Sequence, residues 1–544
     1  MKRIRKATEL FWDRWSHKLQ RLLGQLTPVI AFLLIGLAYF LGIRTERTGF
    51  VAEVLDPNLK KITQPVLNAF RGKPPTVPRL VVSMAQDRRD SLLIARENAL
   101  EAGWLYPEEN PRFPVQCRFG DFALQGVLNL RDGPAEDLAL QRWPLHLRVA
   151  DGDTIFGMQT MEMLPVHDIQ ALTGWLMQQA LVEQGQLNFG HAMLELRMNS
   201  MELGLYTLEG RTDSTLLHKW GRGRGPVMRF DDELLTSARA AMDNRLFNSL
   251  PPPQGDWLVA PIMAARNALM LADPITADRY QNAVDRLEEL RAGKSHPSDV
   301  FEIEGMAKLF ALADILGGQS SMAWWNLRFL ADSTSDRLIV IPQRIQAGRP
   351  IEGISALQLN GPLTFSTGSI GFQDRLFNDS IFYRHYLANL DTFSGEGWLE
   401  GFFDRMAPGI EERERIIKAE YPQEVLDTNI FHHNRTVIEQ TLRPKDLVLA
   451  YTQSVDQNRR RLALANVHAL PIEAVAVVSG TDTFPLAKAQ ILLPRELDKP
   501  LTYTLVNTRI PKREGQPEHL LVRVLGLPDL RSVTIKTWST FVAN

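Results

Sequence analysis

The alternation of apolar and polar residues between Pro78 and about Gly210 predicts a set of short strands with one helix. The residues of Leu145–Val149 read Leu-His-Leu-Arg-Val, a pattern typical of a strand with one buried face. Met193–Leu208 predicts a hairpin whose arms are joined at the polar pair Asn199-Ser200. The helix is predicted over Asp168–Gln184.

A mainly helical region follows and contains a second predicted hairpin. Helical patterning covers Phe230–Asn244, Ile262–Ala292 and Glu302–Leu316. The segments WWNLRFL and RLIVIP, within residues 324–342, then alternate as the two arms of a hairpin should. Further helices with aromatic stripes are predicted up to about Met406, and stripes at this spacing usually belong to a core.

The pattern changes after about Pro444. Short alternating segments, separated by Pro, Gly, Asn and Asp, predict a β-sandwich of about seven strands over residues 445–544. Modules of this kind usually bind a partner or brace a neighbouring domain. Tyr503 and Trp538 are too few to predict an aromatic platform for carbohydrate.

The N-terminal segment predicts a location in the cell. Leu22–Ile43 carries no charge and would be about 33 Å long as a helix, enough to cross a bilayer. Seven lysines and arginines among residues 1–25 place the N-terminus in the cytoplasm by the positive-inside rule. A cleaved signal peptide is the alternative, but no small-residue cleavage site follows. We therefore expect a single-pass protein of a bacterial inner membrane, with residues 1–21 as a cytoplasmic amphipathic segment, 44–77 as a stalk, and the bulk in the periplasm.

Composition narrows the classes of function. The chain has 544 residues, enough for two or three domains, and a net charge of −2. This charge predicts no general attraction to nucleic acid. Cys117 is the single cysteine, so the chain has neither an internal disulfide nor a Cys/His zinc pattern.

Three phrases of the first region carry a resemblance to a known family. They are LNLRDG, WPLHLRVADGDTIFGM and LRMNSMELGLYTLEGRTD, in this order. They resemble the spore-coat protein H kinase family (CotH-like), an atypical branch of the kinase fold, and the resemblance continues to about Met406. It implies an α+β fold class: an atypical two-lobed kinase-like domain over residues 78–440, with a β-rich N-lobe and a helical C-lobe. The β-sandwich would follow this domain, and one transmembrane helix would precede it.

The resemblance also marks positions for a nucleotide site. Arg142 stands where relatives carry a basic pair, and Glu209 stands at the glutamate of the family's hairpin. Arg229 occupies a lysine position, and Asn326 matches the family's asparagine. Each position also has a plain alternative: Arg142 as a solvated residue at a strand end, and Glu209 as an edge glutamate. Arg229 is no equivalent of lysine, because a guanidinium is planar and always protonated.

The carboxylates that should hold a metal are missing from this pattern. The first aspartate position of the family falls on Ser321, and its W-D-x-D motif becomes Gln343–Gln346, with Arg344 at an aspartate position. A hard divalent cation prefers charged oxygen ligands, whereas serine and glutamine are weak ligands and arginine repels the metal. We therefore expect no metal site. Arg344 is a candidate to supply the positive charge in the metal's place.

These substitutions predict a pseudokinase-like scaffold or partner-binding protein of the cell envelope rather than an enzyme. No cofactor is expected, and the partner is expected to be a protein in the membrane or envelope. The alternative is an active atypical Ser/Thr protein kinase of the CotH-like family that depends on ATP and Mg. A third possibility is an assembly factor for a surface polymer or coat, docked to a membrane complex through residues 1–43.

Overall fold

The computed structural model describes residues 76–537, except for residues 188, 212–216, 218–219, 222–224, 233–253, 265–272, 333–334, 359–370, 446, 457–458, 497–498 and 511–516. These residues all belong to one compact unit, residues 75–544. The predicted span Leu22–Ile43, nearly all of the predicted stalk and most of the predicted helix Phe230–Asn244 lie outside the described residues. Within the part described, no helix is long and apolar enough to cross a bilayer.

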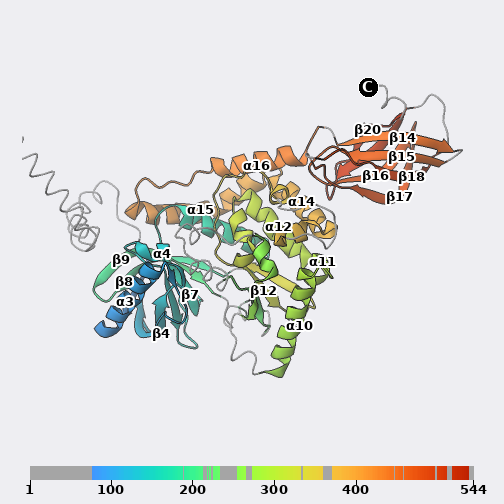
Figure 1. The fold of residues 1–544 in the computed structure, drawn as a ribbon. Coiled ribbons are helices and arrows are strands. Elements are labelled where there is room, and N and C mark those ends of the chain that lie inside the picture. The colour runs from blue at the N-terminus through green and yellow to red at the C-terminus, as the bar shows by residue number, and fades with distance from the viewer. Residues whose placement is uncertain are drawn as a thin grey trace, which may run out of the picture. The chain divides into compact units, whose positions relative to one another are not determined.

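The first part of this unit is a closed barrel of seven strands, in the order β1-β3-β4-β6-β7-β9-β8 (Figure 1). Its strands are β1 (Arg79–Ser83), β3 (Phe113–Phe119), β4 (Phe122–Leu130), β6 (Leu145–Val149), β7 (Thr160–Pro165), β8 (His191–Met198) and β9 (Met201–Gly210). All neighbouring strands pair antiparallel except β1 and β8, whose parallel pairing closes the barrel. Closure leaves no free sheet edge.

The barrel interior is apolar because every second residue of each strand points inward. Residues buried inside it include Leu128, Leu147, Met161, Met163, Leu194, Leu196, Tyr206 and Leu208. Leu92 and Ala99 of helix α3 (Gln86–Ala102) join the same core. The short elements β2 (Trp104–Leu105), β5 (Gly133–Pro134) and α4 (Glu136–Ala139) lie near α3, with β2 paired to β5.

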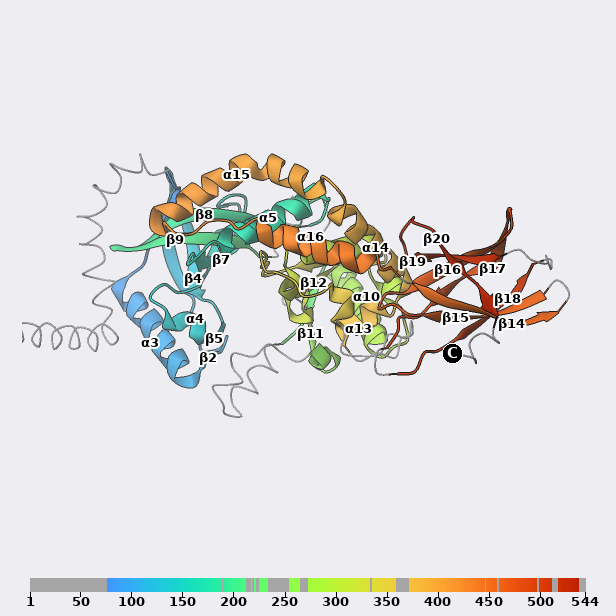
Figure 2. The same ribbon diagram turned by 90° about the horizontal axis from the view of Figure 1, so that it is seen from above.

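A four-stranded sheet and a group of helices form the middle of the unit. The sheet order is β11-β10-β12-β13, with β10 (Val227–Phe230), β11 (Ile262–Ala264), β12 (Leu327–Ala331) and β13 (Leu338–Pro342). The helices are α5 (Gln170–Glu183), α10 (Pro274–Arg291), α11 (Pro297–Val300), α12 (Ile303–Ile315), α13 (Phe372–Phe377), α14 (Ser380–Ser394), α15 (Trp398–Glu420) and α16 (Asn429–Leu442). Helix α15 packs on α5 (Figure 2).

Aromatic side chains hold this middle part together. The buried ring of Phe230 makes edge contacts with Trp257 and Phe329, at centroid distances of 5.6 and 5.3 Å. Phe230 was predicted to begin a helix, but it ends strand β10. Burial of large rings at such distances is among the strongest contributions to a core. The packing therefore fixes the strands next to the site described below.

The C-terminal part consists of two four-stranded sheets that share one core. Their orders are β18-β15-β14-β21 and β17-β16-β19-β20. The strands are β14 (Val448–Asp456), β15 (Arg459–Asn466), β16 (Ile472–Ser479), β17 (Asp482–Leu492), β18 (Thr504–Arg509), β19 (Glu518–Val524), β20 (Arg531–Thr534) and β21 (Lys536–Thr537). Buried residues of both sheets, such as Leu462 and Val522, belong to the same apolar cluster as the helices. Glu473 of β16 binds Arg384 of α14 at 2.9 Å across the boundary.

The predicted fold class is wrong. The structure is a mixed α/β protein with a closed seven-stranded barrel and several further sheets, where a two-lobed kinase-like domain was predicted. The parallel pair β1–β8 joins residues more than 100 positions apart, and periodicity within each strand carries no information on such a pairing. The transmembrane helix in the predicted class, Leu22–Ile43, lies outside the described residues.

Candidate functional site

A row of polar side chains crosses five neighbouring strands on the outer wall of the barrel. Asn129 of β4 lies opposite His146 of β6, and His146 lies opposite Glu162 of β7. Glu162 lies opposite Glu209 of β9, and Glu209 lies opposite His191 of β8. The residues next to them in each strand point into the barrel, so the row faces outward. Although it is on the outer wall, the row is largely covered, and Glu162 is only 2% exposed.

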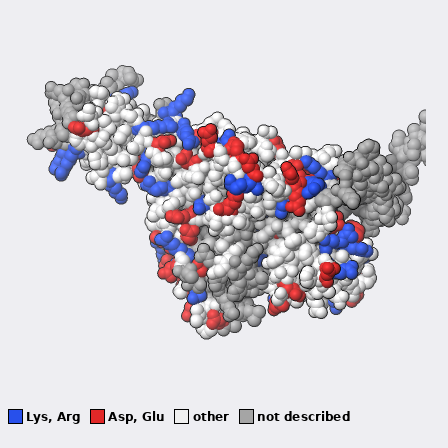
Figure 3. All heavy atoms as spheres, turned by 180° about the vertical axis from the view of Figure 1, so that it is seen from behind, with Lys and Arg blue, Asp and Glu red and all other residues white. Residues whose placement is uncertain are grey.

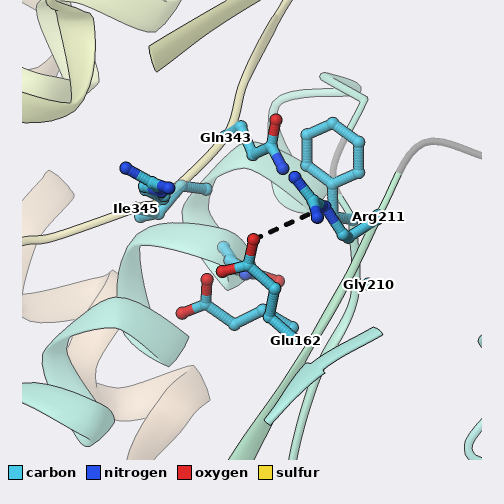
Figure 4. Close-up of a pocket in the computed structure, with 9 residues that line it drawn as sticks. Glu162, Gly210, Arg211, Gln343 and Ile345 are labelled. Atoms are coloured by element: carbon cyan, nitrogen blue, oxygen red, sulfur yellow. Dashed lines mark ion pairs between the residues drawn. The ribbon is translucent and has the colours of Figure 1, made fainter. Parts of the chain in front are cut away.

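Segments from the middle of the unit cover the two glutamates and leave a small cavity. The lining includes Gln178 of α5, Arg211 directly after β9, and Gln343, Arg344 and Ile345 directly after β13 (Figure 4). The cavity encloses about 270 Å³ between the surrounding atoms, part of it open to solvent. Its interior has room for about one water molecule. Ligand pockets are usually larger, at about 300–1,000 Å³.

The closest cation to Glu162 is Arg211. Their Nε and Oε1 atoms are 3.4 Å apart, and Figure 4 shows the two side chains facing each other across the cavity. Burial by itself raises the pKa of Glu162, but the charges of Arg211 and of other arginines outweigh this effect and lower the pKa to about 2. Glu162 is therefore ionised and compensated at neutral pH.

Glu209 has the opposite behaviour although it is the cross-strand neighbour of Glu162. Burial, and next the negative charge of Glu162, raise the pKa of Glu209 to about 7. His191, on its other side, adds no positive charge near neutral pH, because burial and the charge of Arg413 lower the pKa of that imidazole to about 3. The two glutamates thus carry between one and two negative charges at neutral pH.

Arg344 lines the cavity but does not form an ion pair with either glutamate within 4 Å. Its side chain is exposed, and its backbone has a φ of 57°, a left-handed conformation that non-glycine residues seldom adopt. Its positive charge still lowers the pKa of Glu162 and opposes the rise of the pKa of Glu209. The structure therefore brings Arg344 and Glu209 into one site, with Arg211 as the nearer cation.

The other predicted site residues lie in separate contacts. Arg142 binds Glu420 of α15, with Nη1 and Oε1 2.8 Å apart, and its guanidinium lies 5.8 Å from the ring centre of Tyr421. Arg229 pairs with Asp231 at 3.1 Å, and does not line the cavity. These arginines serve contacts within the chain.

Ser321 and Asn326 brace the backbone around β12 and β13. The hydroxyl of Ser321 donates to the backbone carbonyl of Gln346 at 2.9 Å and accepts from the backbone N–H of Gln346 at 2.8 Å. The amide of Asn326 donates to the carbonyl of Ser320 at 3.0 Å. At these positions the side chains hold the segment that carries Arg344 in place.

Sequence reasoning missed Glu162, Arg211 and Gln178. The only local signal was a charged residue between two methionines in the segment TMEMLP, which is equally typical of a solvated strand face. The described residues contain no group of three or more His, Cys, Asp or Glu side chains that could hold a metal ion. Asp314, the carboxylate nearest in sequence to Ser321, is buried and accepts hydrogen bonds from Ser355, Gln319 and Tyr386.

No family model matches the chain, and no curated protein matches it either.

Proposed function

We propose that the chain is a non-catalytic, partner-binding protein, and that its cavity is a braced joint rather than a nucleotide site. The size of the cavity carries this proposal: a space for about one water cannot hold a triphosphate. The resemblance to the CotH-like family stays a prediction, and the proposal does not depend on it.

The charges around the cavity support the same proposal. Phosphoryl transfer needs carboxylates that hold a divalent metal beside the phosphates. The cavity offers two glutamates, of which Glu162 is already paired with Arg211 and Glu209 is partly protonated at neutral pH. Arg344 adds a second positive charge that opposes the entry of a cation. The chain thus supplies its own cation to Glu162, and Glu209 is held partly neutral instead.

The proposal predicts that the full chain neither binds nor uses ATP. Isothermal titration with ATP in the presence of Mg²⁺ or Mn²⁺ should give no binding heat, and incubation with γ-labelled ATP should give no labelled protein. The reason is that the cavity has no space for a nucleotide and that the described residues contain no cluster of side chains that could hold a metal ion.

Two matched variants make this test decisive. Metal-dependent ATP binding that is lost in Glu162→Gln but kept in the exposed-site control Glu101→Gln would show that the cavity opens to a nucleotide. That outcome would refute the proposal and favour the alternative of an active kinase. Ser321→Asp combined with Arg344→Asp places acidic residues at two family positions. We expect this variant to remain inactive, because shortening one lining side chain does not make room for a triphosphate.

A further inference from the structure

Three exposed arginines lie together on the outer face of the sheet β18-β15-β14-β21. Arg459 and Arg461 of β15 are exposed, as is Arg509 of β18. Arg459 lies directly opposite Arg509, and Arg461 lies opposite Asn507. The three side chains therefore share one face, separated by one strand spacing or by two residues along a strand.

This arrangement does not stabilise the sheet. Like charges that lie directly opposite each other on neighbouring strands repel. None of the three arginines forms an ion pair with another residue that the structure describes, although Asp456 of β14 lies opposite Arg459. Arg460, which points inward between them, is by contrast paired with Glu518. On the surface shown in Figure 3, Lys and Arg side chains are generally interspersed with Asp and Glu.

In the described part of the chain, the same face ends at the edge strand of its sheet, which β17 of the other sheet contacts without pairing. β18 is the terminal strand of its sheet, and β15 is the strand with which it pairs in the described part of the chain. The backbone groups on the outer side of a terminal strand are open to pairing with another extended chain. A polypeptide can form this ladder, whereas a polysaccharide or a nucleic acid has no backbone that continues a sheet.

We propose that the edge of β18 binds an extended acidic segment of a partner protein as an additional strand, with its acidic side chains on the same face as the three arginines. This names the chemistry of a partner, which the proposed function leaves open. It rests on the proposed function only in expecting a protein partner, because the cavity and this face share no residue.

The exposed residues of β18 define the segment that fits. Leu505, Asn507 and Arg509 alternate on the exposed face, and Leu505 is 43% exposed. An antiparallel partner strand would place an acidic residue opposite Arg509, a polar residue opposite Asn507 and an apolar residue opposite Leu505. Acidic residues on the N-terminal side of this partner segment would lie past Arg509, where the positive charge of Arg459 still attracts them.

A labelled peptide tests the proposal on the full chain. The probe is a synthetic peptide of about ten residues with a Glu-Ser-Thr-Ser-Val core and glutamates before it, and binding is followed by fluorescence anisotropy. We expect the combined change Arg459→Gln, Arg461→Gln and Arg509→Gln to weaken binding about tenfold. The control Arg112→Gln, Arg118→Gln and Lys294→Gln removes the same charge at exposed positions outside the C-terminal sheets and should leave the affinity unchanged.

A second experiment distinguishes backbone pairing from charge attraction alone. N-methylation of alternate peptide amides prevents the peptide from pairing as a strand but keeps its charges, so it should abolish binding. An unmethylated peptide that fails to bind, or equal losses in both triple variants, would overturn the proposal. So would tighter binding of polygalacturonate or duplex DNA than of the peptide.

Self-association of the arginine variant without peptide binding by the native chain would show that the arginines only protect the edge. None of these results depends on whether ATP binds, so this proposal and the proposed function fail separately.

Discussion

Replacing Glu209 with glutamine is expected to stabilise the protein at pH 8 by about 1–3 kcal/mol and to leave its stability near pH 4.5 almost unchanged. The pKa of Glu209 rises from 4.5 to about 7, first because of burial and next because of the charge of Glu162. In the unfolded chain this carboxyl ionises near pH 4.5, so between pH 4.5 and about 7 the native state binds more protons than the unfolded state does. Stability therefore falls as the pH rises from about 4.5 to 7, and this loss disappears in a variant that has no carboxyl.

Urea denaturation of the native chain and of Glu209→Gln across pH 4.5–8, followed by tryptophan fluorescence, measures this effect. The matched control is Glu101→Gln. Glu101 is exposed on α3, so this substitution removes the same charge from a position that is not buried. Equal pH dependence in the native chain and in Glu209→Gln would show that Glu209 is not held against Glu162.

The second large effect is expected from Arg211→Met, which should lower the free energy of unfolding by about 2–4 kcal/mol at pH 7. The substitution leaves the Glu162 carboxylate, whose side chain is 3% exposed, without the guanidinium that lies 3.4 Å away. An uncompensated buried charge is costly, whereas a buried neutral amide is less so. The double variant Arg211→Met with Glu162→Gln should therefore recover part of the loss.

The pH dependence of this pair has the opposite sign to that of Glu209. Because the pKa of Glu162 is lowered from 4.5 to about 2, its contribution is present above pH 4.5 and is lost as the pH falls toward 2. Arg148→Met is the control, since Arg148 and its partner Asp151 form an exposed pair, with side chains 47% and 84% exposed. Such pairs contribute about 0–1 kcal/mol. If the Arg211 and Arg148 variants lost equal stability, the cavity would not depend on this ion pair.

Local elements were the predictable part of the fold. The strand predicted over Leu145–Val149 is β6 with the same ends, and the predicted hairpin at Asn199-Ser200 is the β8–β9 hairpin. Asn199 adopts a φ of 51°, which asparagine tolerates better than most residues. These features depend on neighbouring residues, so the alternation of side chains within one segment is enough to reveal them.

The site was predictable only in fragments. Glu209 and Arg344 were named from the sequence, and both line the cavity, but Arg142 and Asn326 serve other contacts. The partners that decide the chemistry, Glu162 and Arg211, gave no distinctive local pattern. Their role follows from strand pairing, since Glu162 becomes the neighbour of Glu209 only when β7 pairs with β9.

The order of apolar and polar residues thus determined local elements such as strand β6 and the β8–β9 hairpin, because the two backbone periods are local properties of the chain. It did not determine β10 and β11, which begin where helices were predicted or end there. Tertiary structure decided that the first seven strands close into a barrel, because closure depends on the pairing of β1 with β8, far apart in sequence. It also decided the state of the two cavity glutamates. Their pKa values differ by several units because burial and neighbouring charges, not residue type, set the cost of ionisation.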